Sequence, residues 1–158
     1  FINWGDWLMS PKDSHYYFQP KILIRQIIGK KFICSIDNSN AIADQSLYIA
    51  VPYEGREASL EAILAVLNSK LYGFYFRKFY SEEDDLFPKI KVNELKRLPF
   101  KQPSIKIEQK LADFTRKILE EKEKNSGFDS LVIENQIDQL VYQLYELNEE
   151  EIKIVEQS

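Results

Sequence analysis

Two β-rich runs joined by a short turn decide the fold: Lys21-Ile22-Leu23-Ile24-Arg25-Gln26-Ile27-Ile28, then Gly29-Lys30-Lys31, then Phe32-Ile33-Cys34-Ser35-Ile36. Branched aliphatic side chains dominate the first run. In the second run Phe32, Cys34 and Ile36 alternate with their neighbours at the period of two that is typical of a strand. A glycine followed by polar residues is typical of a hairpin turn. The stretch therefore predicts two neighbouring strands connected by a hairpin.

A third strand and a polar loop complete the predicted sheet. The run Ser46-Leu47-Tyr48-Ile49-Ala50-Val51 is β-rich, and Pro52 ends it. Between the second and third strands lies Asp37-Asn38-Ser39-Asn40. The side chains of such residues can close turns on their own backbone, so the run predicts an ordered loop.

The hydrophobic period then changes to that of a helix. Five residues recur at i, i+3, i+4 and i+7: Leu60, Ile63, Leu64, Leu67 and Leu71. Ser59 is placed to cap this helix, and Glu61 lies in its first turn. The spacing predicts one long helix to about Tyr75 that braces the sheet. Asn68 falls on its polar edge, where the amide can fasten a loop.

The remaining segments predict a short extended piece and a helical tail. Residues 86–92 read as extended, residues 93–97 as a helical turn, and Pro99 and Pro103 mark a boundary. Two amphipathic helices follow, separated by a stop at residues 125–127 and a cap at Asp129, and the short connection favours an antiparallel pair. A capping box at Asn148 opens a last short helix that runs through Val155. The sequence thus predicts an α+β fold, with a small, mostly antiparallel sheet and its bracing helix at 1–100, followed by a helical hairpin and a short last helix at 101–158.

Composition excludes several classes of protein. Of 158 residues, 44% are hydrophobic and 13% aromatic, enough for a packed core, and no apolar run approaches the roughly 20 residues needed to cross a membrane. The start lacks a secretory signal and a methionine, so we expect the middle of a longer protein. A single cysteine, Cys34, and a single histidine, His15, exclude a disulfide framework and the usual zinc sites. We expect a cytoplasmic location.

The charge is unevenly distributed along the chain. The net charge is -4, but residues 1–100 hold 13 Lys/Arg against 12 Asp/Glu, whereas residues 101–158 hold 8 against 13. Four of the acids in the first part lie together at 82–85. The rest of that part is therefore mildly basic, which permits binding to nucleic acid without demonstrating it.

Catalytic motifs are missing from the sequence. It contains no glycine-rich phosphate loop, no nucleophile elbow and no Asn/Asp-Pro-Pro-aromatic signature of adenine methyltransferases. Asp85 followed by Glu94 and Lys96 imitates a metal-dependent nuclease, but such a site needs carboxylates on adjoining strands, and Glu94 falls in a predicted helical turn. We therefore expect neither a catalytic centre nor a bound metal.

Several polar side chains are candidates for contacts with DNA, although each also has an ordinary role as a solvated or turn-forming residue. Cations on turns and extended segments suit phosphates: Lys30, Lys31, Arg77, Lys78, Lys89 and Lys91. Amides that pair with adenine suit base reading: Gln26, Asn38 and Asn40.

Five stretches of the sequence resemble one known family. They are residues 18–27, 47–51, 64–75 and 90–99 and the tail at 137–152. The family is the TaqI-like C-terminal specificity domain of type II restriction-modification enzymes and adenine methyltransferases. The motif Leu67-Asn68-Ser69-Lys70 and the tail are the most specific parts of the resemblance. The sequence departs from the family at Asn148, where relatives often carry threonine, and in the acidic run at 82–85.

The resemblance implies a non-catalytic module that recognises double-stranded DNA, with residues 1–100 as its target-recognition domain. The catalytic work then belongs to an N-terminal methyltransferase or nuclease part of the same polypeptide. S-adenosylmethionine and Mg²⁺ are implied for that part and no cofactor for this chain. Two alternatives stay open: a protein-interaction or spacer module built on the helix pair, and half of a type I specificity subunit. The family-like ending argues against the second.

Overall fold

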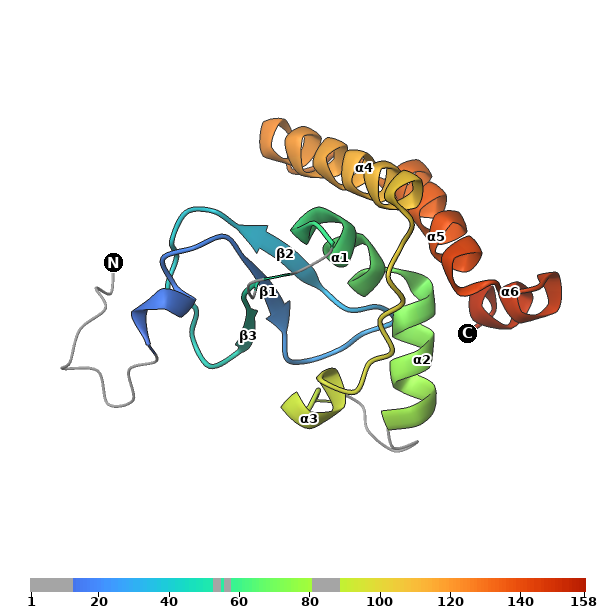
Figure 1. Ribbon diagram of the computed structural model, residues 1–158, viewed down its shortest axis with the longest axis horizontal. Helices are drawn as coiled ribbons and strands as arrows, with labels where there is room; N and C mark the ends of the chain where they lie inside the picture. Colours follow the sequence, from blue (N-terminus) through green and yellow to red (C-terminus); the bar gives the residue numbers. More distant parts are fainter. Residues whose placement is uncertain (1–12, 53–54, 56–57, 81–88) are drawn as a thin grey trace.

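The structure, a computed structural model, describes residues 13–52, 55, 58–80 and 89–158 and is drawn in Figure 1. A short 3₁₀ helix, η1 (Ser14–Tyr16), leads into an antiparallel sheet of three strands, β1 (Lys21–Arg25), β2 (Cys34–Asp37) and β3 (Leu47–Ala50). The strand order is β2-β1-β3, so β1 is central and pairs with both neighbours. The predicted antiparallel pair and third strand are confirmed, but the connection is longer than the predicted turn at 29–31, because β1 ends at Arg25 and β2 begins at Cys34.

One face of the sheet belongs to the core. Ile22 and Ile24 on β1 are almost fully buried, and their cross-strand partners pack on the same core: Cys34, Ile36, Tyr48 and Ala50. Helix α1 (Leu60–Leu67) packs between this sheet and helix α4 (Ile105–Lys124). Ser59 caps α1 by accepting a hydrogen bond from the Ala62 N–H, as its position in the sequence predicts.

The predicted single helix from Leu60 to about Tyr75 is wrong, because the chain breaks at Asn68 and Ser69. The second part is helix α2 (Lys70–Tyr80), which turns away from α1. The Ser69 hydroxyl donates to the Val66 carbonyl at 2.7 Å and accepts from the Tyr72 N–H at 3.3 Å, so it ends one helix and begins the next. Local bonds made by the Ser69 side chain thus replace backbone bonds of a continuous helix.

The turn between β1 and β2 lies against α2 at Gly73. A Cβ atom at this position would meet the Lys30 carbonyl oxygen at 2.4 Å and the Lys31 Cα at 2.9 Å. Nearby, the rings of Phe32 and Phe76 meet edge to face with centroids 5.3 Å apart. Only glycine allows the backbone of the hairpin to approach the helix this closely.

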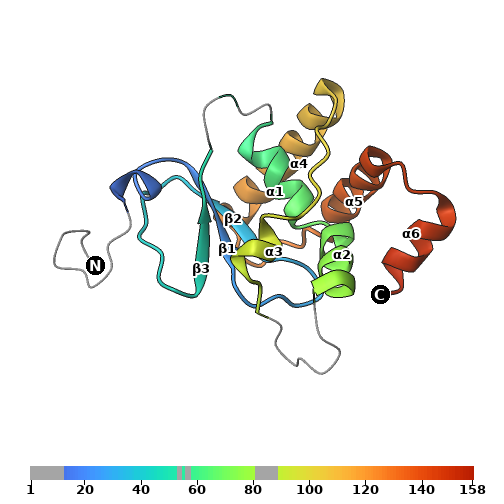
Figure 2. The same ribbon diagram turned by 60° about the horizontal axis from the view of Figure 1, so that its bottom comes forward.

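The tail folds onto the same core. After the short helix α3 (Val92–Leu95), α4 and α5 (Leu131–Tyr145) form the predicted antiparallel pair, and α6 (Glu149–Glu156) begins with the predicted capping box (Figures 1 and 2). The cap of α5 is Ser130, one residue later than predicted, although the Asp129 carboxylate accepts from the Leu131 N–H. Leu111 and Val141 are fully buried in one cluster with Ile22, so the core is continuous across residue 100.

Candidate nucleic-acid interface

The candidate residues divide between the two ends of the sheet. The hairpin turn with Lys30 and Lys31 lies beside α2, whereas the loop with Asn38 and Asn40 lies at the far end of β2 (Figure 1). Eight residues separate Lys30 from Asn38, which at about 3.3 Å per extended residue gives a separation of at most about 26 Å. This is less than one turn of a DNA duplex, roughly 34 Å, so one duplex could touch both ends.

Two basic segments come together at the hairpin end. Ile27 forms a β-bridge with Lys89, and the Ile90 N–H donates to the Gln26 carbonyl at 2.8 Å. Ile90 is fully buried, whereas the side chains of Lys89 and Lys91 on either side of it are exposed, as expected of an extended segment with one buried face. The bridge therefore brings the extended segment at residues 89–91 beside the segment that leads into the turn with Lys30, although the two are nearly sixty residues apart in sequence.

The six residues predicted to contact phosphates differ in their exposure and in whether other side chains of the protein bind them. Lys30, Lys78 and Lys89 are exposed and form no ion pair within the described part of the chain. Lys91, whose side chain is exposed, lies 3.5 Å from the Glu94 carboxylate, a long and weak pair. Arg77 is half-buried, donates to the Ser158 hydroxyl at 3.2 Å, and has a pKa lowered by burial.

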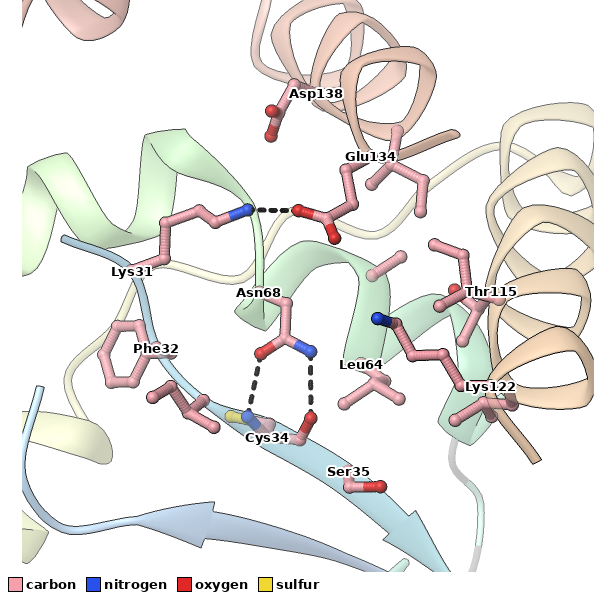
Figure 3. Close-up of a pocket in the computed structure, with 15 residues that line it drawn as sticks. Lys31, Phe32, Cys34, Ser35, Leu64, Asn68, Thr115, Lys122, Glu134 and Asp138 are labelled. Carbon is pink, nitrogen blue, oxygen red and sulfur yellow. Dashed lines mark hydrogen bonds and ion pairs between the residues drawn. The ribbon is translucent and has the colours of Figure 1, made fainter. Parts of the chain in front are cut away.

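Lys31 is engaged by the tail, as Figure 3 shows. Its ammonium lies 2.6 Å from the Glu134 carboxylate on α5, and both side chains are about one-third exposed. Burial by itself raises the pKa of Glu134, but hydrogen bonds from Lys31 and Ser130 outweigh it and lower the pKa. Lys31 would therefore have to exchange this carboxylate for a phosphate.

The predicted base-reading residues are placed unequally. Asn38 and Asn40 are exposed, and Asn40 has a positive φ of 59°, which asparagine tolerates better than most residues. Gln26 is half-buried, and its backbone bonds to Ser46 on one side and Ile90 on the other. The loop amides are thus available to a ligand, whereas that of Gln26 is partly enclosed.

Arg25 is a candidate that the sequence analysis missed. It is exposed at the end of the central strand, where its backbone pairs with Leu47 on β3 and its N–H donates to the Ile33 carbonyl. The signal was present, because alternation with Ile22 and Ile24 puts Arg25 on the face opposite the core. A guanidinium at this place can contact either a phosphate or a guanine.

The cavity between β2, α1, α4 and α5 has a structural role. It measures about 290 Å³, and at its floor the Asn68 amide holds the backbone of Cys34 through two hydrogen bonds (Figure 3). This confirms that Asn68 fastens a neighbouring segment, which is a strand rather than a loop. Burial raises the pKa of the Cys34 thiol to about 12, so it stays protonated and unreactive at neutral pH.

The nuclease-like pattern does not form a site in the described residues. The Glu94 carboxylate accepts from the Lys91 N–H at 2.9 Å and caps α3, and no three His, Cys, Asp or Glu side chains gather in a way that could hold a metal there. Asp85 and the acidic run at 82–85 lie outside the described residues.

Two further features concern other classes of protein. His15 is exposed and lies beside Asp13 on the surface. Within the same described residues no helix is long and apolar enough to span a membrane.

Comparison with known proteins relates the chain to a family and to a larger protein. The family model of the TaqI-like C-terminal specificity domain matches residues 1–100. A Methanocaldococcus jannaschii protein, named for type II restriction enzyme and methyltransferase activity, is 30% identical over 129 residues. The match covers 79% of this chain but only 11% of that relative, so the chain spans a small part of the larger protein.

Proposed function

Since the chain belongs to the family of TaqI-like C-terminal specificity domains, we propose that it recognises a specific sequence in double-stranded DNA. The observation that carries the proposal is the bridge between Ile27 and Lys89, because it gathers exposed lysines from two segments at one end of the sheet. Lys30, Lys89 and Lys91 then contact phosphates, supported by Lys78 and, after rearrangement, by Lys31 and Arg77. Such contacts position a protein on the duplex without reading its sequence.

Base reading belongs to the other end of the sheet. Asn38 and Asn40 each offer a donor and an acceptor that match adenine, and Gln26 and Arg25 are secondary candidates. The duplex lies along the sheet, so that both ends touch it. The helical tail faces away, because its net negative charge would repel phosphates within a Debye length of about 8–10 Å.

We propose that catalysis belongs to the rest of a longer polypeptide. The relative's name combines restriction and methylation, and the chain corresponds to about a tenth of it. In this proposal the remaining part methylates adenine with S-adenosylmethionine and, where it cleaves, uses Mg²⁺. The described residues of this chain do not fit a metal site, since Glu94 is committed to a helix cap. The division at residue 100 is then one of roles: recognition before it, support after it.

A protein-interaction module is the second candidate. It is favoured by apolar side chains that the tail leaves exposed, above all Ile105 at 76% and Val132 at 73%. The interaction would be with the catalytic part of the same enzyme, so it is compatible with DNA recognition.

Salt-dependent binding tests the proposal. Lys30→Ala and Lys89→Ala should each weaken binding to all duplexes alike and reduce the slope of log affinity against log salt by about one unit. Lys117→Ala is the matched control, because Lys117 is an exposed lysine on α4. With Mg²⁺ and S-adenosylmethionine present, the chain should neither cut nor methylate the duplex. If both substitutions leave affinity and slope unchanged, the proposed surface is wrong.

A further inference from the structure

We propose that the buried pair of Lys21 and Asp37 is a positioning element that holds the loop at residues 38–41 in the shape that reads DNA. The inference rests on the proposed function and names residues that act through others. Neither residue is among the predicted DNA contacts.

Lys21 is an unusual lysine because it is completely buried. It lies on the central strand, opposite Asp37 on β2, and its side chain has no exposed surface. Its ammonium donates to the Tyr17 carbonyl at 2.9 Å and to the Asp37 carboxylate. A buried ion pair adds little stability compared with an apolar pair of similar size, so stability alone is a poor reason for having one here.

The Asp37 carboxylate is also the centre of the loop that follows it. One oxygen accepts from the Ser39 N–H at 3.1 Å and the Ser39 hydroxyl at 2.6 Å, and the other accepts from the Ala41 N–H at 3.1 Å. The chain winds around this group, and Asn40 adopts its left-handed conformation inside the turn. The anchor from Lys21 therefore fixes the carboxylate, and the carboxylate fixes the loop.

These bonds hold the loop backbone in place and leave two side-chain amides exposed. Asn38 and Asn40 are exposed, while the backbone between them is tied to a group that cannot move without leaving the Lys21 ammonium unpaired. A loop held in its binding shape loses less conformational freedom when it binds, and this favours the ligand that fits that shape. The pair would thus contribute to discrimination between sequences more than to general attraction.

The next turn of the chain shows what is special about this arrangement. Asp44 makes similar local bonds, accepting from the Ser46 N–H at 2.8 Å and from the Ser46 hydroxyl at 2.5 Å. Asp44 is exposed and has no ion pair within the described part of the chain. Local turn formation therefore needs no buried lysine, and Lys21 supplies something further at Asp37.

The test replaces the pair by neutral residues of similar length. Lys21→Met combined with Asp37→Asn removes both charges together, so no buried charge is left alone and the chain should fold. Asp37→Asn by itself leaves the Lys21 ammonium unpaired and is the destabilised comparison. The matched control is Lys101→Met with Glu146→Gln, because this 2.7 Å pair joins the start of the tail to the end of α5, away from the loop.

Two measurements are made on each variant. Selection from a pool of random duplexes gives the preferred sequence of the wild-type chain, and titrations compare that duplex with a scrambled one at the same salt concentration. The double variant should bind the preferred duplex at least tenfold more weakly and the scrambled duplex equally well. Hydrogen exchange without DNA should show faster exchange of the Ser39 and Ala41 amides, and the control should match the wild type in both measurements.

The outcomes separate the two proposals. A wild-type chain with no preference among duplexes would refute the proposed function and this inference with it. A wild-type preference that the double variant fully retains would refute the positioning role alone. Equal losses on both duplexes would also overturn it, because they would indicate a general defect rather than lost discrimination.

Discussion

Asn68→Leu should destabilise the fold by detaching the edge of β2 from the junction between α1 and α2. The Asn68 side-chain oxygen accepts from the Cys34 N–H at 2.9 Å, and its nitrogen donates to the Cys34 carbonyl at 3.0 Å. The amide thus pairs with the strand as another strand would. Leucine has a similar size but makes neither bond, so both backbone groups of a half-buried residue lose their partner.

The magnitude follows from these two bonds. An unpaired buried polar group costs about 1–3 kcal/mol, and since Cys34 is only partly buried, water can compensate in part. We expect a loss of about 2–4 kcal/mol in the free energy of unfolding. For a chain of this size each kcal/mol lowers the melting temperature by about 2–4 °C, so the shift should be roughly 5–15 °C.

Urea and thermal unfolding followed by circular dichroism measure this loss. Asn135→Ala is the control, because Asn135 is exposed and its side-chain oxygen accepts a hydrogen bond from the Lys70 ammonium at 3.2 Å. The control should lie within about 0.5 kcal/mol of the wild type. If Asn68→Leu lies equally close, the amide does not secure the strand, and the reasoning on the break between α1 and α2 fails with it.

Two other predictions concern the hairpin and the loop. Gly73→Ala should lower the free energy of unfolding by about 1–3 kcal/mol, because the new Cβ atom would collide with the Lys30 carbonyl. Gly29→Ala is the control and should change stability much less, because a Cβ atom there meets open space. Chemical denaturation of both variants measures the difference. Burial raises the pKa of the Asp37 carboxyl, but hydrogen bonds from Lys21 and Ser39 outweigh it and hold the pKa at about 2, below its ordinary 3.8. The ionised Asp37 carboxylate therefore stabilises the folded state by about 2 kcal/mol above pH 4, and this stabilisation is lost as the pH falls toward 2. The difference in unfolding free energy between wild type and Asp37→Asn should shrink by that amount over this range. An unchanged difference would contradict the lowered pKa of Asp37.

The strands and helix ends were predictable because their signals are local. Alternation around Ile22 and Ile24 identifies the core face of β1, and Ser59 and Asn148 cap helices as their positions in the sequence suggest. The break after Leu67 was not predictable, because Leu71 continues the helical period across it. Its cause is tertiary: Asn68 bonds to β2, and the Lys70 N–H donates to Asp138 on α5 at 2.9 Å.

The candidate interface likewise combines features with a local sequence signal and features that depend on tertiary contacts. Exposure of Lys30 and Lys89 follows from turn and strand patterns, but their proximity depends on a bridge between residues 27 and 89 that no local pattern reports. The role of Lys21 was hidden for a related reason. A lysine at the start of a strand ordinarily points to solvent, and only the pairing of β1 with β2 shows that it faces a carboxylate.

The acidity of the tail has a second explanation besides repulsion from DNA. Glu134 holds Lys31, and Asp138 and Glu156 both meet Lys70, so three tail carboxylates neutralise cations of residues 1–100. The Tyr72 and Tyr145 hydroxyls, 2.9 Å apart, join α2 to α5 at the Pro99 carbonyl. These contacts fix α2, and α2 fixes the hairpin through Gly73. In the proposed function, the tail would therefore act on recognition without touching DNA, by deciding where the turn with Lys30 lies and how strongly Lys31 is withheld from a phosphate.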